Sequence, residues 1–323
     1  MPSDARLLLI DRDQVERLMR PADVMNAVRE AFVLHSQREG RVFPVVREPL
    51  VTGGIFGIKS GDVQSQGLLG FKAAGFWPGN RKLAGEPHQA TVMLIDPATG
   101  RPVCLIDGNA ITTMRTGAAG ALGLKTLARA DSTRVCVFGT GVQATIQLRF
   151  ALEHLAALDQ VQYVTYNGER DLKFEVEFSQ RCEVSHATDR DEAVAASDVV
   201  VTATPGAGAL FDADAVQPGT HLNCVGADTK GKRELPDGVL LRAKLVVDDR
   251  EQAMQIGEMQ WAPHTAAIEL GDLLTGKTVF HRQATDITLF DMTGLALQDL
   301  TVARLLYRRA VDEGVGSSIP WPW

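Results

Sequence analysis

The stretch that most constrains the fold of this chain is Arg134–Ala144, with the sequence RVCVFGTGVQA. An apolar, β-rich run over Arg134–Phe138 ends abruptly in Gly139-Thr140-Gly141, and a helical pattern follows over Thr145–Leu155. A strand, a tight turn with this glycine spacing and a helix are typical of the first βαβ unit of a doubly wound, or Rossmann, dinucleotide-binding fold.

A small residue is favoured at each of these positions of the turn for a physical reason. Gly139 suits the backbone angles of the turn, and Gly141 lets a pyrophosphate approach the main chain. Ala144 lets helix and strand pack closely, while the first turn of the helix offers unpaired N–H groups to phosphate oxygens. We therefore predict cofactor contacts from the turn and the start of the helix, namely Gly139, Thr140, Gly141, Val142, Gln143 and Ala144.

Strand and helix patterns alternate beyond this turn. The strand-like runs are Val161–Tyr166, Ser197–Thr204, His221–Val225 and Lys244–Asp248, the last two being expected as the fifth and sixth strands. This alternation predicts a parallel sheet that binds its ligands at the carboxyl ends of the strands. Further cofactor contacts are therefore expected at the end of the second run: Thr202, Ala203 and Thr204.

The chain before this region has a different pattern. Two helices are expected, over Asp11–Arg20 and Pro21–Glu39, and short alternating runs then predict a mainly antiparallel sheet. These runs are Val42–Val51, Gly54–Ser60, Leu68–Phe76, Ala90–Asp96 and Pro102–Ile106. A long helix of small residues, Asn109–Ala130, leads into the dinucleotide-binding part.

Near the end of the chain, a strand-like Ile287–Phe290 precedes a helix over Ala296–Tyr307 that we expect to return to the first domain. The predicted class is α/β, with a dinucleotide-binding domain over residues 116–299 and a mainly antiparallel α+β domain over residues 1–115 and 300–323.

The choice between NAD and NADP depends on the residues after Val161–Tyr166. An acidic side chain there accepts hydrogen bonds from the ribose 2′-hydroxyl and repels a 2′-phosphate. The segment supplies Asn167, Glu169 and Arg170 as candidate cofactor contacts. Glu169 favours NAD and Arg170 leaves NADP open, and the alternative is that both belong to a solvated turn.

Charge and composition exclude several classes of function. A formal net charge of −7 over 323 residues argues against nucleic acid or an anionic membrane as the main partner. No apolar run reaches ~18 residues and no signal-peptide pattern opens the chain, so we expect no membrane segment. Four cysteines without metal-ligand spacing predict a cytoplasmic protein without a metal site.

A candidate catalytic carboxylate, Asp228, follows the run His221–Val225, where the fold places the nicotinamide. A carboxylate beside a hydride-transfer site can give or take a proton. The alternative is that Asp228 caps the helical or turn segment that begins near Gly231.

The first domain supplies candidate substrate-binding residues. Arg47, Lys59 and Lys72 lie in strand-like runs among apolar neighbours, and Arg115 lies near the start of the small-residue helix. A lone charge is costly to bury, so these cations indicate either an anionic ligand or structural ion pairs. His88 opens another strand-like run, and its alternative is an ordinary surface or core histidine.

Several dispersed motifs together resemble the ornithine cyclodeaminase/μ-crystallin family over nearly the whole chain. The matching stretches are Gly70–Ala74 with Pro78–Asn80, Leu94–Gly100, Asp107–Ala119, Gly139–Ala144, Gly226–Asp228 with Gly231–Leu235, and Ile287–Phe290 with Gln298–Leu300. The resemblance implies a dinucleotide domain, a substrate-binding domain whose sheet forms a homodimer, and chemistry at an α-amino or α-imino carbon.

By motif position, the resemblance implies that Lys72 and Arg115 bind the substrate carboxylate, with Arg47 as a third contact. The resemblance also implies a catalytic role for Lys72, because its charge would polarise the C=N carbon. Asp228 corresponds to the catalytic acid/base.

One departure from the family bears on the substrate. Members that cyclise ornithine carry a glutamate where this chain has Phe56, and a Met-Pro where it has Ile58-Lys59. A cationic substrate side chain would lose its anionic partner and meet Lys59, which argues against cyclisation of ornithine or lysine.

We therefore expect an NAD(P)-dependent imine reductase or amino-acid dehydrogenase. The surplus cation Lys59, with Arg47 or His88, suggests a second carboxylate and thus iminosuccinate, which would give aspartate. The alternatives are a cyclodeaminase or cyclic ketimine reductase, and a non-enzymatic binding protein of the μ-crystallin type. The presence of Lys72, Arg115 and Asp228 together argues against the last.

Overall fold

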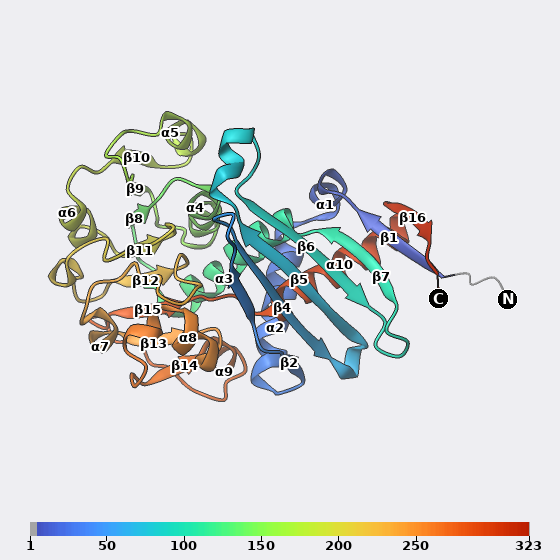
Figure 1. The fold of residues 1–323 in the computed structure, drawn as a ribbon. Coiled ribbons are helices and arrows are strands. Elements are labelled where there is room, and N and C mark those ends of the chain that lie inside the picture. The colour runs from blue at the N-terminus through green and yellow to red at the C-terminus, as the bar shows by residue number, and fades with distance from the viewer. Residues whose placement is uncertain (1–4, 323) are drawn as a thin grey trace. The chain divides into compact units, whose positions relative to one another are not determined.

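The computed structural model of the chain describes residues 5–322, which form two compact units (Figure 1). The first unit comprises the chain up to residue 115 and again from residue 295, and the second comprises residues 116–294. The return to the first unit thus begins earlier than the residue 300 expected from the sequence. The second unit has a parallel sheet and the first a mostly antiparallel one, which confirms the predicted α/β class.

The sheet of the first unit has the strand order β16-β1-β7-β6-β5-β4-β2, with β3 paired to β4. Its strands are β1 (Arg6–Ile10), β2 (Gly40–Val42), β3 (Val46–Pro49), β4 (Ile55–Val63), β5 (Leu68–Phe76), β6 (His88–Ile95), β7 (Pro102–Asp107) and β16 (Ser317–Pro320). β1 and β7 run parallel, and the other neighbours are antiparallel. β1 and β16, short strands at one edge, were not predicted.

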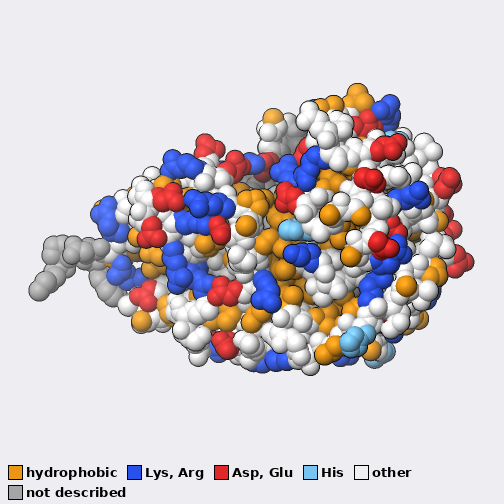
Figure 2. Space-filling model, turned by 180° about the vertical axis from the view of Figure 1, so that it is seen from behind, with side chains coloured by type: hydrophobic (Ala, Val, Ile, Leu, Met, Phe, Trp, Pro, Cys, Tyr) orange, Lys and Arg blue, Asp and Glu red, His pale blue; other side chains and the backbone are white. Residues whose placement is uncertain are grey.

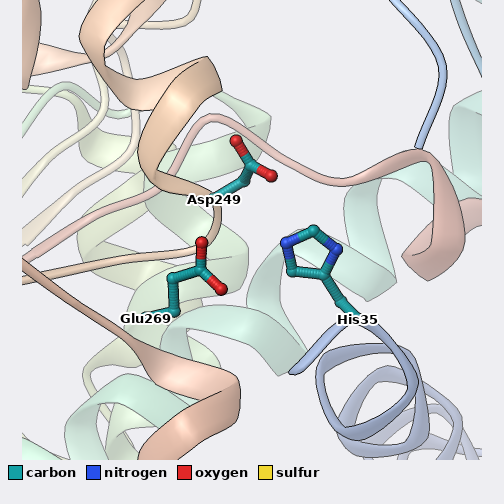
Figure 3. A group of neighbouring side chains, drawn as sticks. All are labelled: His35, Asp249 and Glu269. Carbon is teal, nitrogen blue, oxygen red and sulfur yellow. The ribbon is translucent and has the colours of Figure 1, made fainter. Parts of the chain in front are cut away.

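Helices cover one face of this sheet. They are α1 (Arg12–Leu18), α2 (Pro21–Ser36) and α10 (Ala296–Glu313), and α3 (Gly108–Leu127) begins in this unit. α10 packs against α2 and against β4, β5 and β6, and Figure 1 shows α2 and α10 on the same side of the sheet. His35 lies in the last turn of α2 (Figure 3).

Two facing glycines bring α10 close to the sheet. Gly61 of β4 and Gly70 of β5 are directly opposite each other. A Cβ at Gly70 would lie 2.9 Å from Leu300 Cδ2, and one at Gly61 would lie 3.5 Å from Leu297 Cδ2. Because these positions lack side chains, the leucines of α10 fill the space above them.

The sheet of the second unit is parallel throughout, in the order β10-β9-β8-β11-β12-β15-β13-β14. Its strands are β8 (Arg134–Phe138), β9 (Gln160–Val164), β10 (Glu183–His186), β11 (Val199–Thr202), β12 (His221–Cys224), β13 (Lys244–Val247), β14 (Ala267–Glu269) and β15 (Thr288–Asp291). β12 and β13 are the fifth and sixth strands of this unit in chain order, as expected, but they are not neighbours in the sheet. β15, buried at all four positions, lies next to β12, and β13 lies beyond it.

Short helices flank this sheet. They are α4 (Val142–His154), α5 (Leu172–Phe178), α6 (Arg190–Ala195), α7 (Val239–Arg242), α8 (Arg250–Ile256) and α9 (Leu270–Leu274), with the end of α3. The side chain of Asp249 caps α8 by accepting from Gln252 N at 2.6 Å, and Glu269 accepts from Arg250 N at 3.3 Å. Each cap satisfies an N–H that the helix itself leaves unpaired.

The small residues of α3 are required by its neighbours in the second unit. A Cβ at Gly117 would lie 2.7 Å from Phe150 Cδ2, and one at Gly123 would lie 2.4 Å from Phe290 Cδ1. The predicted long helix is confirmed, and its glycines let α4 and β15 place aromatic rings against its backbone.

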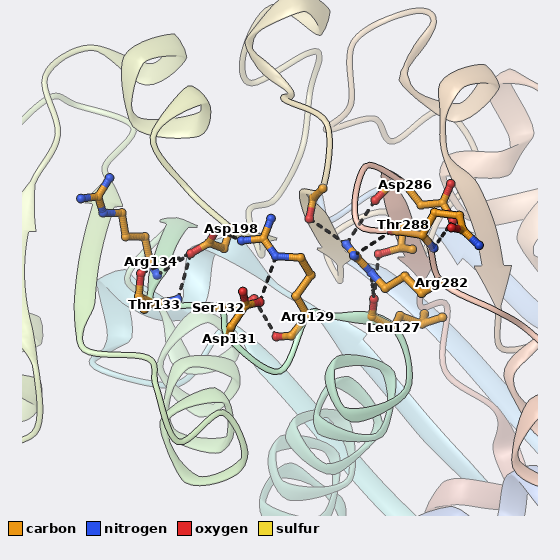
Figure 4. Close-up of polar contacts among 12 residues, drawn as sticks. Leu127, Arg129, Asp131, Ser132, Thr133, Arg134, Asp198, Arg282, Asp286 and Thr288 are labelled. Atoms are coloured by element: carbon orange, nitrogen blue, oxygen red, sulfur yellow. Dashed lines mark hydrogen bonds and ion pairs between the residues drawn. The ribbon is translucent and has the colours of Figure 1, made fainter.

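Charged side chains form hydrogen bonds and ion pairs at the amino ends of the strands of the second unit (Figure 4). Asp198 accepts from Thr133 N at 2.8 Å and pairs with Arg129. Arg282 donates to four main-chain carbonyls, at 2.7 Å to Leu127 and Gly219, at 3.1 Å to Asp286 and at 3.3 Å to Gln283. These arginines stabilise the sheet at the amino ends of its strands, whereas such folds bind ligands at the carboxyl ends.

On the face drawn in Figure 2, basic and acidic side chains are interspersed with apolar ones. Among the described residues, no helix combines the length and the apolar character needed to cross a membrane.

Candidate active site

The turn after β8 has the geometry of a dinucleotide-binding turn. Gly139 has φ +98°, and a Cβ there would lie 3.0 Å from the carbonyl oxygen of Ala203. Gly141 is the N-cap of α4, and a Cβ there would meet no described atom within 4 Å. Glycine is therefore required at the first position, and open space lies in front of the second.

The start of α4 suits a phosphate. No side chain of the described residues caps this helix, so its first N–H groups, beginning with those of Val142 and Gln143, are available to an anion. Ala144 is completely buried against the sheet. Thr202 pairs in register with Phe138, so the structure brings the expected contacts after β11 beside the glycine turn.

A buried carboxylate that we did not predict, Glu234, joins the ends of two strands. It accepts from the N–H and Oγ1 of Thr204 after β11, both at 2.7 Å, and from Gly226 N after β12 at 2.9 Å. Its own N–H donates to Glu258 at 2.7 Å. Burial raises the pKa of Glu234, and it raises the pKa of Glu258 to about 8. The sequence signal for Glu234 was its place in the motif Gly231–Leu235.

Asp228 lies in the loop after β12, with its side chain 33% exposed. Lys232 Nζ is 2.7 Å from Asp228 Oδ1 and 3.2 Å from the carbonyl oxygen of Gly226. The next helix, α7, begins only at Val239, but a turn in which Lys232 N donates to Thr229 O follows Asp228 directly, so the capping alternative for Asp228 stays open for this turn. The pair with Lys232 stabilises Asp228 as a carboxylate in a partly open position.

The residues after β9 form local contacts. Asn167 Nδ2 donates to Glu169 at 2.8 Å, and Arg170 pairs with Glu175 of α5. Asp171 caps α5, and a hydrogen bond from Thr140 of the glycine turn lowers its pKa. Asp171 was not among the predicted contacts, although it is the carboxylate that contacts the turn.

The first unit collects its cations on one face of its sheet. Lys59 of β4 and Lys72 of β5 are directly opposite each other, and both are more than 90% buried. Asp299 of α10, which we did not predict, lies 2.9 Å from Lys72 Nζ and 3.2 Å from Arg115 Nε. Lys72 and Arg115 therefore form ion pairs with Asp299, which is one of the two roles expected for them.

The charges of this cluster influence one another. Burial and the nearby charges of Arg115 and Lys59 lower the pKa of Lys72 to about 7, although Asp299 acts in the opposite direction. Burial opposes ionisation of Asp299, but the cations keep its pKa below the ordinary value. Gln298 accepts from Arg115 at 3.1 Å, and its buried Nε2 has no hydrogen-bond partner among the described residues. Such an unused donor beside buried cations fits an anionic ligand.

Arg47 and His88 lie on the same face, each half-buried. Arg47 is opposite Gly57, two residues before Lys59 on β4. His88 is opposite Phe76, four residues beyond Lys72 on β5. Since alternate residues of a strand share a face, the structure brings all the predicted substrate-binding residues of these strands to one side of the sheet.

Comparison with known proteins places these features in context. The model of the ornithine cyclodeaminase/mu-crystallin family matches residues 7–314. An alanine dehydrogenase of Archaeoglobus fulgidus is 34% identical over 97% of this chain and 98% of that protein. An iminosuccinate reductase of Paracoccus denitrificans is 32% identical over 97% of this chain and 99% of that protein.

Solved structures resemble the chain over the same length. An archaeal alanine dehydrogenase dimer with bound NAD has a TM-score of 0.91 and 32% identity, covering 98% of this chain and all of that one. The iminosuccinate reductase of Paracoccus denitrificans with NAD⁺ has a TM-score of 0.87 and 31% identity, over 98% and 99% of the two chains. A Δ¹-pyrroline-2-carboxylate reductase of Thermococcus litoralis, solved with NADH and L-proline, has a TM-score of 0.90 and 29% identity, over 97% and 100%.

Proposed function

Because this chain belongs to the ornithine cyclodeaminase/mu-crystallin family, we propose that it is an NAD-dependent oxidoreductase that reduces a 2-imino acid to an amino acid. The family resemblance read from the sequence motifs is confirmed. The relatives named above are dehydrogenases and reductases, which supports this class of reaction.

The second unit would hold the cofactor. The glycine turn and the first N–H groups of α4 would bind the pyrophosphate, and NAD in its reduced form would supply the hydride. Two features favour NAD over NADP: the carboxylate of Asp171 contacts the turn through Thr140, and Arg170 is already paired with Glu175.

The first unit would bind the substrate carboxylate. The observation that carries this proposal is the buried group of Lys59, Lys72, Arg115 and Asp299, in which Lys72 and Arg115 share one carboxylate. A bound carboxylate would interact favourably with these cations and accept from the unused Nε2 of Gln298. Charge from Lys72 and Arg115 would also polarise the C=N carbon toward hydride attack.

Asp228 would face the substrate nitrogen. Asp228 is paired with Lys232, and its carboxylate would accept a hydrogen bond from a protonated imine and orient it for hydride attack, which gives the neutral amine without a further proton. We infer that the substrate is dicarboxylic, with iminosuccinate giving aspartate as the leading candidate. Lys59 supports this, because it is a third buried cation and lies directly opposite Lys72 in the sheet.

Turnover tests the substrate directly. NADH oxidation is measured with ammonia and either oxaloacetate or pyruvate, using wild type, Lys59→Met and Asp228→Asn. We expect turnover with oxaloacetate, a KM for it that rises about tenfold in Lys59→Met, and loss of turnover with unchanged NADH affinity in Asp228→Asn. Turnover with pyruvate alone would refute the dicarboxylic substrate, and turnover with neither, together with no NADH binding, would refute the enzyme class.

A homodimer would cover the other face of the first unit's sheet. Phe71, Met93 and Leu105 form a half-buried apolar row across β5, β6 and β7, on the face opposite Lys72. A second copy of this chain suits that row, as the related alanine dehydrogenase is a dimer. Light scattering should give a dimer for wild type and a monomer for Met93→Lys, and a monomeric wild type would exclude this arrangement.

A cytoplasmic location remains our proposal. The four cysteines are unpaired, and burial raises the pKa of Cys104 to about 12. Unreactive, reduced thiols suit a reducing compartment.

A further inference from the structure

A network at the end of β9 occupies the place where this fold reads the ribose 2′ position of a dinucleotide. Arg170 Nε lies 3.0 Å from Glu175 Oε1, and Arg170 Nη2 lies 2.6 Å from Glu175 Oε2. Arg170 and Glu175 therefore form a bidentate ion pair, in the geometry that a guanidinium also adopts with phosphate.

Glu175 is itself held in place. The hydroxyl of the buried Tyr163 donates to Glu175 Oε1 at 2.5 Å and accepts from the N–H of Asp171 at 2.9 Å. The side chain of Glu175 is 14% exposed, against 65% for Arg170. The carboxylate is thus the fixed partner, and the guanidinium is the group that would move.

The charge on Glu175 is permanent under working conditions. Hydrogen bonds from Arg170 and Tyr163 lower the pKa of Glu175 to about 2. At neutral pH the pair is therefore electrically neutral, and a second anion approaching Arg170 would meet the negative charge of Glu175 as well.

We propose that Glu175 sets the preference of this chain for NAD over NADP by holding Arg170 in an ion pair that a 2′-phosphate would have to break. The inference rests on the proposed function as a dinucleotide-binding enzyme and deepens it. Arg170 taken alone would favour NADP, since arginine near this position accommodates the 2′-phosphate. Glu175, a residue on the following helix, cancels that effect.

The test uses Glu175→Gln, because glutamine keeps an acceptor for Tyr163 and removes the charge. Affinities for 2′,5′-ADP and for ADP, which lacks the 2′-phosphate, are measured by isothermal titration calorimetry. We expect the affinity for 2′,5′-ADP to rise about tenfold and that for ADP to change less than about twofold. The gain should shrink in high salt, because the freed guanidinium is exposed.

Two further variants separate this role from a general change of charge. Glu177→Gln removes a carboxylate from the same helix that pairs with Arg149 instead, so it should leave both affinities unchanged. The double variant Glu175→Gln/Arg170→Met should lose the gain. Arg170→Met alone should leave both affinities near wild type, because the paired arginine contributes little to either ligand.

The outcomes distinguish the inference from the proposed function. A folded Glu175→Gln protein that binds ADP and NADH but shows no gain for 2′,5′-ADP overturns the inference. If Glu175→Gln does not fold, Arg170→Met decides, since a large loss of 2′,5′-ADP affinity would mean that Arg170 is already available. Wild type that binds neither ADP nor NADH would instead refute the proposed function.

Discussion

Replacing Asp299 with asparagine should destabilise the first unit strongly. The carboxylate lies 2.9 Å from Lys72 Nζ and 3.2 Å from Arg115 Nε, and all three side chains are at least nine-tenths buried. Removing the anion from such a site leaves cations without compensation, which costs about 3 to 5 kcal/mol. That is a large share of the ~5–15 kcal/mol by which typical domains are stable.

The cost should depend on pH in a defined direction. In wild type the pKa of Lys72 is about 7 when folded and 10.5 when unfolded, so the unfolded chain binds more protons between these values and stability rises with pH. Asp299 raises the folded pKa of Lys72, so the variant has a lower one. Below about pH 7 wild-type stability levels off while that of the variant keeps falling, and the difference widens.

Urea unfolding at about pH 6 and pH 8.5 measures both effects, through the midpoint at constant slope. Glu16→Gln is the control, because Glu16 forms an exposed ion pair with Arg12 and should cost no more than about 0.5 kcal/mol. An Asp299→Asn protein within ~1 kcal/mol of wild type at the lower pH, or a difference that does not change with pH, would refute the argument.

Three further expectations follow from single contacts. Gly139→Ala should cost about 1 to 3 kcal/mol in thermal unfolding and weaken NADH binding in fluorescence titrations, because φ is +98° and Ala203 leaves no room; unchanged binding would contradict this. Arg282→Lys should cost about 2 kcal/mol, since one ammonium cannot bind all four carbonyls that Arg282 reaches, and an unchanged melting temperature would contradict this. The value of kcat/KM for the imine should fall as pH rises through about 7, where Lys72 loses its proton in the free enzyme. The variant Lys72→Arg should lack that inflection. An inflection that persists in the variant would belong to another group.

The parts of the fold that were predictable are local in sequence. The turn Gly139–Gly141 lies between a strand and a helix whose patterns are continuous with it, so a short segment carries the whole signal. The place of β15 between β12 and β13 was not predictable in this way, because strand order depends on pairings between distant segments.

The candidate site shows the same limit. Lys72 and Arg115 were found because a charge in an apolar run is conspicuous, but their shared partner Asp299 lies far along the chain. A signal was present: Asp299 is a carboxylate between the apolar Leu297 and Leu300 of a helix. A carboxylate on the buried side of a helix requires a cation, and pairing it with the buried lysines would have predicted the cluster.

The bonds of Glu234 have a consequence for how such a chain can change its specificity. One carboxylate fastens the segment after β11 to the segment after β12, and Asp228 follows only two residues beyond Gly226. Shifting either segment alone would break a buried hydrogen bond, so the two are constrained to move as a single piece. We therefore expect substrate specificity to change more readily through substitution of side chains such as Lys59 than through movement of these segments. Such substitutions leave the nucleotide-binding framework unchanged.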